Sequence, residues 1–135
     1  MIIETITTDS GLCVTMQDQT SHYFGGYYHV KVRAYCDILL IQNYFDNAVE
    51  FLKAGNVLGS SVRFERLLEK MAVMEPEIGL VRDQLMQTFR ETTLKYLSVP
   101  GFERRFVISE YKRQTNKTQI RTSRAYFEAA NVCHR

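Results

Sequence analysis

The chain has 135 residues, of which 45% are hydrophobic and 24% charged, and its net charge is +2 at pH 7. This length predicts one self-sufficient hydrophobic core, and the composition excludes a disordered or fibrous protein. The small net charge gives no reason to expect a polyanionic partner. No run approaches the roughly 18 apolar residues of a membrane span, and no signal peptide begins the chain, so we expect a cytoplasmic protein without membrane contact.

Three cysteines, Cys13, Cys36 and Cys133, are widely separated along the chain. An odd number at this spacing fits neither a disulfide framework nor the paired cysteines of a structural zinc site. We therefore expect reduced thiols, with Cys13 and Cys36 acting as small apolar fillers of the core.

Charge is unevenly distributed along the chain. From residue 103 to the end there are eight basic and three acidic residues, a net charge of +5, whereas the first 102 residues carry −3. A basic segment can bind nucleic acid or an acidic partner, although solvated charge is its commoner meaning. We expect a single α+β domain over residues 1–111, followed at 112–135 by a basic, partly flexible tail with room for a short helix.

The first forty residues show the period-two pattern of β-strands. Residues 2–8 are rich in β-branched side chains, Asp9-Ser10-Gly11 predicts a turn, and residues 12–17 alternate between apolar and polar. Residues 18–21 are interpreted as the next connection. Alternation is clearest from residue 28, where one face is predicted to join the core: Tyr28, Val30, Val32, Ala34, Cys36 and Ile38. Together these segments predict a three-stranded antiparallel meander.

After Leu40 the apolar period becomes helical. Asn43 is expected to cap a first helix that ends near Gly55, followed by a loop over residues 55–59. A second helix is expected to open at Ser60 or Ser61, with the apolar stripe Phe64, Leu67, Leu68 and Met71. Met71 and two further methionines, Met74 and Met86, are expected mainly to fill the core.

The third predicted helix begins at Pro76, a residue suited to a first helical turn, and runs to Leu97. Beyond Gly101 the pattern allows a helix or a strand, and a fourth helix is favoured over a strand. Residues 114–124 lack an apolar period and are interpreted as flexible. The predicted fold class is therefore α+β, an N-terminal three-stranded antiparallel meander followed by three to four helices packed on one face.

The outward face of the third strand concentrates rings and charges. The segment 22–26, which contains His22 and the pair Gly25-Gly26, precedes the strand and is interpreted as a turn. This enrichment predicts a binding surface rather than a catalytic centre. Its expected members are His22, Tyr23, Gly25, Gly26, Tyr27, His29, Lys31, Arg33 and Tyr35.

Catalytic and cofactor signals are weak. The Gly25-Gly26 pair lacks the other glycines of a dinucleotide loop, and no serine or cysteine stands in a recognisable nucleophile motif. Seven residues separate His22 from His29, a spacing that reverses the face of a strand, so shared metal ligation is disfavoured. We accordingly predict no catalytic residue, no metal and no cofactor.

Three functions stay open on the sequence. The leading hypothesis is a non-enzymatic module that binds a protein partner or forms a homodimer, because a small sheet has edges that need covering or pairing. The second is binding of single-stranded nucleic acid by the aromatic and basic face together with the basic tail. The third is a small-ligand or metal-dependent activity around His22 and His29.

Overall fold

The computed structural model describes the backbone of residues 1–133 and the side chains of residues 1–117. The chain forms an α+β fold, as predicted, and divides into two compact units. Unit 1 comprises Met1–Ile38 and Arg63–Phe102, and unit 2 comprises Leu39–Val62 and Glu103–Arg135. The predicted division into a domain at 1–111 and a tail at 112–135 stays a prediction.

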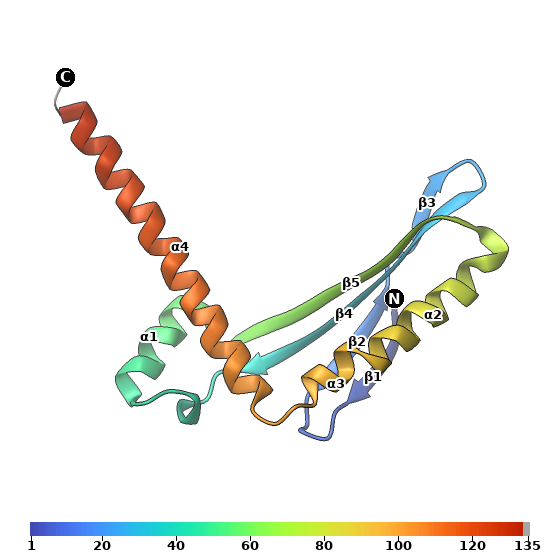
Figure 1. The fold of residues 1–135 in the computed structure, drawn as a ribbon, viewed down its shortest axis with the longest axis horizontal. Coiled ribbons are helices and arrows are strands. Elements are labelled where there is room, and N and C mark those ends of the chain that lie inside the picture. The colour runs from blue at the N-terminus through green and yellow to red at the C-terminus, as the bar shows by residue number, and fades with distance from the viewer. Residues whose placement is uncertain (134–135) are drawn as a thin grey trace. The chain divides into compact units, whose positions relative to one another are not determined.

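A five-stranded sheet is the centre of unit 1 (Figure 1). Its strands are β1 (Ile2–Thr7), β2 (Cys13–Asp18), β3 (Ser21–Phe24), β4 (Tyr27–Leu39) and β5 (Ser61–Met74). Strands β1 and β2 form the predicted antiparallel hairpin, and Gly11 in its turn has a φ of 93°. Such a φ favours glycine because it has no Cβ. The hairpin at the start of the chain is thus confirmed.

The next hairpin is longer than the sequence indicated. Strands β2 and β3 both pair with β4 in one continuous register, since Asp18 opposes Val32 and Ser21 opposes His29. The amide of Gln19 donates to the carbonyl of Lys31 at 2.8 Å and so bridges the two segments. The predicted connection over residues 18–21 is shorter in the structure, at Gln19 and Thr20, and it joins β2 to β3 along the same partner strand instead of turning the chain into β4.

The chain reverses instead at Gly25-Gly26. Gly25 has a φ of 56°, and Phe24 and Tyr27 on either side of the glycines oppose each other. A positive φ at the first position of a two-residue turn favours glycine, which explains Gly25. The interpretation of residues 22–26 purely as a turn is accordingly corrected, because β3 occupies Ser21–Phe24.

The second predicted helix is wrong, because its residues form β5. Strand β5 pairs with β4, and three ion pairs join the two strands: His29–Glu69, Arg33–Glu65 and Asp37–Arg63. Their numbers increase along β4 and decrease along β5, so the strands run antiparallel. The helical spacing of the apolar residues was misleading, because the free edge of β4 supplies hydrogen bonds and charges that local propensity does not include.

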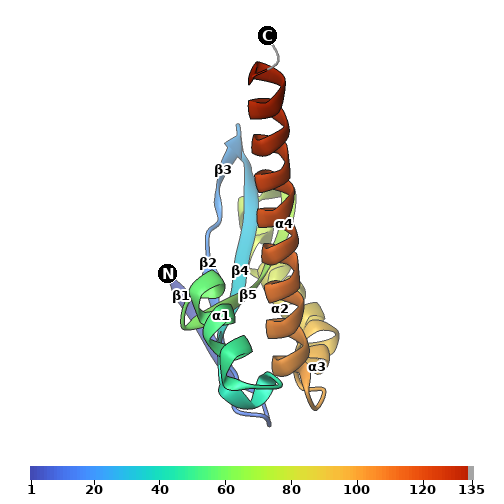
Figure 2. The ribbon, with the colours of Figure 1, turned by 90° about the vertical axis from the view of Figure 1, so that its left-hand side faces the viewer.

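The even-numbered face of β4 belongs to the core from Val30 onward, as predicted, whereas Tyr28, which was predicted to join it, is only half-buried. Val30, Val32, Ala34, Cys36 and Ile38 are all at most 2% exposed. Helices α2 (Ile78–Glu91) and α3 (Thr93–Leu97) pack on one side of the sheet (Figures 1 and 2), which leaves the odd-numbered face without a helix from unit 1. The helix predicted from Pro76 to Leu97 is confirmed, with a short 3₁₀ turn at its start and a break at Thr92.

Within that core, Val81 of α2 lies in one cluster with Val30 of β4 and Val73 of β5. Inward positions of β5 are even-numbered at Val62 and Phe64 but odd-numbered at Val73. Ala72, with a φ of 56°, lies immediately before Val73 and accounts for this change. A residue in the left-handed region inside a strand shifts the alternation by one position, as in a β-bulge.

Unit 2 contains a 3₁₀ turn (Gln42–Tyr44), α1 (Ala48–Leu58) and most of α4 (Phe102–Cys133). Both predicted ends of α1 are wrong. Its N-cap is Asn47, whose side chain accepts from the amide of Glu50 at 2.9 Å, and its C-cap is Gly59, with a φ of 82°. Asn43 lies in the 3₁₀ turn, and Gly55 lies inside the helix.

The fourth predicted helix is confirmed as α4. Its backbone stays helical through residues 114–124, where the sequence favoured a flexible segment, and through 125–130, where a short helix was expected. No helix in the described part of the chain combines the length and apolar character that crossing a membrane requires.

Candidate interaction surface

The predicted ladder lies on one face of β4. Tyr27, His29, Lys31, Arg33 and Tyr35 occupy alternate positions opposite the core side chains, and all except Tyr27 are half-buried. We call this face of the sheet, together with the β5 side chains that it contacts, the ladder face.

Arg33 makes the most extensive contacts on the ladder face. Its Nε donates to Oε1 of Glu65 at 2.6 Å, and its Nη2 donates to Oε2 of the same carboxylate at 3.3 Å. A third nitrogen, Nη1, lies 3.5 Å from Oε1 of Gln17 on β2. The hydrogen bond from Arg33 is the main cause that lowers the pKa of Glu65 below its ordinary value, and the pKa of Arg33 is raised in return. The bidentate pair with Glu65 holds the guanidinium in place, so Arg33 of β4 contacts side chains of both β5 and β2.

Tyr35 lies between two guanidinium groups. The central carbons of Arg33 and Arg63 are each 4.5 Å from the centroid of its ring, a distance typical of cation–π contact. Arg63 also donates to both oxygens of Asp37, at 2.8 and 3.0 Å, which lowers the pKa of that carboxyl group. The Tyr35 ring thus contacts two arginines that are themselves paired with carboxylates.

Charge on the ladder face is balanced. Three cations, Lys31, Arg33 and Arg63, share it with three carboxylates, and Nε2 of His29 lies 2.8 Å from Oε2 of Glu69. Single-stranded nucleic acids bind grooves with excess positive charge and free aromatic rings. The ladder face lacks that excess, because its two arginines are paired with Glu65 of β5 and Asp37 of β4.

The two histidines lie on opposite faces of the β3–β4 hairpin. His22 opposes Tyr28, an inward position, whereas His29 opposes Ser21 on the ladder face. His22 contacts the carbonyl of Gly25 through Nε2, and its ring meets the Tyr28 ring edge-on at 5.4 Å. Among the residues that the structure describes, no three His, Cys, Asp or Glu side chains gather in a way that could hold a metal.

Large apolar side chains are exposed where this hairpin ends. Phe24 is 74% exposed, and Tyr27 opposes it directly across the turn. Leu67 and Met71 of β5 alternate with Glu65 and Glu69, which pair with the outward residues Arg33 and His29 of β4, so they lie on the same side of the sheet. We call these residues the tip cluster, and each is at least 45% exposed: Tyr23, Phe24, Tyr27, Leu67 and Met71.

Sequence reasoning missed the part of this surface that β5 contributes. Leu67 and Met71 were not assigned to it, because a helix was expected over β5. One signal was available: Val62 and Phe64 alternate with Arg63 and Glu65, the period-two pattern of a half-buried strand. Two related expectations are also wrong, because Met71 and Met74 are exposed rather than core residues, whereas Met86 is buried.

Of the two predictions that a cysteine fills the core, one is confirmed and one is wrong. Cys36 is 1% exposed and fills the core as expected. Cys13 is exposed, because it alternates with the buried Leu12 and Val14. The thiol of Cys13 is free.

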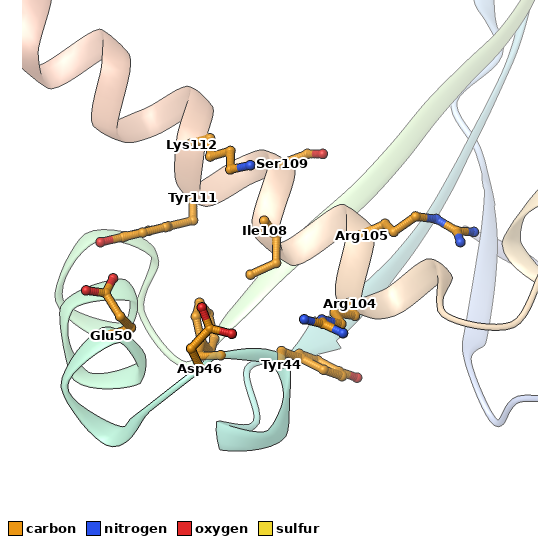
Figure 3. Close-up of a pocket in the computed structure, with 10 residues that line it drawn as sticks. Tyr44, Asp46, Glu50, Arg104, Arg105, Ile108, Ser109, Tyr111 and Lys112 are labelled. Carbon is orange, nitrogen blue, oxygen red and sulfur yellow. The ribbon is translucent and has the colours of Figure 1, made fainter.

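Unit 2 contains a separate pocket of about 590 Å³ that the sequence did not indicate (Figure 3). One wall is the segment 44–50, which leads into α1, and the other wall is the first three turns of α4. The rings of Phe45 and Tyr111 meet edge-on at 6.2 Å within it. The lining residues are Tyr44, Phe45, Asp46, Glu50, Arg104, Arg105, Ile108, Ser109, Tyr111 and Lys112.

Comparison of the chain with known protein families, with curated proteins and with solved structures gave no match in any of the three.

Proposed function

We propose that this protein is a non-enzymatic interaction module that associates with a second copy of itself or with a protein partner. The surface used is the tip cluster together with the adjoining ladder face. The tip cluster is the observation that supports this function most directly, because Tyr23, Phe24 and Tyr27 are exposed at the end of the β3–β4 hairpin, and Leu67 and Met71 are exposed on the neighbouring strand β5. Contiguous exposed apolar patches on small proteins commonly mark interaction sites.

The chemistry of the tip cluster suits a protein partner. Aromatic residues and methionine are enriched in the buried centres of protein interfaces, and methionine adapts its shape to its neighbours. Phe24 and Tyr27 flank the Gly25-Gly26 turn and would supply rigid rings at the centre of the contact. The balanced charges of the ladder face would then form a polar rim that favours a partner of complementary pattern.

Open strand edges support self-association in particular. β1 pairs only with β2, and β5 pairs only with β4, so each has an edge without a strand partner in the described part of the chain. Exposed edges carry unpaired backbone donors and acceptors that a second copy can use. A reducing compartment such as the cytoplasm is part of this proposal, and it fits the free, exposed thiol of Cys13.

The experiment compares the wild-type chain with the double variant Phe24→Ser/Tyr27→Ser. Light scattering after size exclusion measures the assembly state, and affinity capture from a native extract recovers partners. We expect the double variant to lose the dimer or the captured partner. Val49→Ser is the matched control, because Val49 is an exposed apolar residue of α1 in unit 2. Unchanged assembly and partner recovery in the double variant would contradict the proposal.

The same preparation tests nucleic-acid binding. The ion pairs of the ladder face argue against it, because an oligonucleotide would have to compete with Glu65 and Asp37 for the arginines. Titration of single-stranded oligonucleotides at low salt distinguishes the two functions. Tight binding that weakens steeply with added salt would favour nucleic acid over a protein partner.

A further inference from the structure

The pocket of unit 2 carries opposite charges on its two walls. Asp46 and Glu50 lie on the wall that leads into α1, and Arg104 and Lys112 extend from α4 (Figure 3). We propose that this pocket binds a small zwitterion with an apolar body, of about the size of a dipeptide. This site lies wholly in unit 2 and does not depend on the interaction surface of unit 1.

The charges on the two walls do not neutralise each other. Among residues 1–117, no ion pair joins Asp46 or Glu50 to Arg104 or Lys112. The partner of Glu50 is Lys53 on its own helix, at 3.8 Å, and both of these side chains are largely exposed. Opposite charges that face each other across an open pocket are satisfied together by a ligand that has a cationic and an anionic end.

Apolar side chains line the space between the charged walls. Ile108 points from α4 toward the opposite wall, and the ring of Tyr111 extends from α4 toward Glu50 (Figure 3). Phe45 contacts the Tyr111 ring, so an apolar ligand body would meet two aromatic surfaces. A volume of about 590 Å³ falls within the range of small-molecule sites.

Tyr44 adds a hydrogen-bond donor to the pocket. Burial raises the pKa of its phenol, and the nearby carboxylate of Glu103 raises it further. The hydroxyl therefore stays protonated well above neutral pH. In this proposal Arg104 and Tyr44 bind the anionic end of the ligand, and Asp46 and Glu50 bind its cationic end.

The probe for this proposal is the dipeptide glycyl-phenylalanine, titrated into the ¹⁵N-labelled full chain and followed by NMR. We expect saturable shifts confined to residues 44–50 and 104–112. N-acetyl-glycyl-phenylalanine lacks the ammonium group and glycyl-phenylalanine amide lacks the carboxylate, and each should bind about twofold to fivefold more weakly, as expected when one exposed ion pair is lost. Glycylglycine, which lacks the ring, should also bind more weakly.

Two charge-neutralising variants and a matched control locate the site. Arg104→Gln and Glu50→Gln should each weaken glycyl-phenylalanine binding about twofold to fivefold. Arg113→Gln is the control, because Arg113 lies on the same helix, pairs with Glu110 at 2.6 Å and does not line the pocket. The NMR spectrum of each variant shows directly whether it is folded.

Three results would overturn the proposal. The first is the absence of saturable shifts at residues 44–50 and 104–112. The second is equal binding of the singly charged comparison peptides and glycyl-phenylalanine. The third is equal binding by Arg104→Gln and Arg113→Gln. Each of these results leaves the proposed function of the unit 1 surface unaffected, because that function is measured by assembly and capture.

Discussion

The assignment of residues 61–74 as a strand can be tested by truncating two of its apolar side chains separately. Phe64 points into the core, is 3% exposed and contacts the Phe102 ring edge-on at 5.7 Å. Leu67 belongs to the tip cluster and is 47% exposed. A helix over the same residues would place both side chains on one buried stripe. The two structures therefore predict different relative costs of truncation.

In the strand, Phe64→Ala removes a buried ring and should lower the free energy of unfolding by about 3–5 kcal/mol. Leu67→Ala removes a largely solvated side chain and should change it by about 0.5 kcal/mol or less. In a helix with both residues buried, Leu67→Ala would instead cost about 2–5 kcal/mol. The contrast between the variants is larger than the error of the measurement.

Urea unfolding followed by circular dichroism measures both variants. With a slope of about 1–3 kcal/mol per molar urea, the Phe64→Ala midpoint should fall by roughly 2 M, whereas the Leu67→Ala midpoint should stay close to wild type. Phe64→Leu, which costs about 1–2 kcal/mol, keeps the comparison measurable if the alanine variant does not fold. Equal destabilisation by Phe64→Ala and Leu67→Ala would refute the strand and favour the helix.

Three further predictions concern stability. Asn47→Ala removes the N-cap of α1 and should lower the free energy of unfolding by about 1 kcal/mol, as measured by chemical unfolding. Asn43→Ala lies outside that helix and should lower it by less than about 0.5 kcal/mol. The reverse order would contradict the observed start of α1. Gly55→Ala should stabilise α1 by about 0.5–1 kcal/mol, whereas Gly59→Ala, at a φ of 82°, should destabilise it by about 1 kcal/mol, as measured by the thermal midpoint. Burial raises the pKa of Asp18, but hydrogen bonds from Thr20 and Arg82 outweigh burial and lower the pKa below its ordinary 3.8. The ionised carboxylate therefore stabilises the fold above that pH, and its contribution is lost as the pH falls through the lowered pKa. Urea unfolding from pH 7 to pH 2 should therefore show the difference between wild type and Asp18→Asn shrinking below about pH 4, and a difference that is constant with pH would contradict this linkage.

The sequence by itself determined the elements whose pattern is local. The first hairpin, the core face from Val30 to Ile38 and the helical span from Pro76 to Leu97 were all predictable. In each case the period of the apolar residues and the turn or helix-start residues beside them indicate the same structure. The secondary structure of a segment is predictable from its sequence when these local signals agree.

Only the tertiary structure decided what residues 61–74 form. Phe64, Leu67, Leu68 and Met71 have helical spacing, and the strand forms because β4 offers a free edge over thirteen residues. The candidate surface depended on the same decision. Its aromatic and basic residues on β4 were visible in the sequence, but Glu65 and Glu69 of β5, which pair with Arg33 and His29, come from a segment about thirty to forty residues away in the chain.

The pocket of unit 2 was beyond sequence reasoning for a similar reason. Its walls are contributed by residues 44–50 and 104–112, which are separated by more than fifty positions and share no motif. Periodicity reports which face of one element is apolar, but it carries no information about which distant element lies opposite that face. Charge balance, exposure and pocket shape are properties of such pairs of elements, so they are decided when the chain folds.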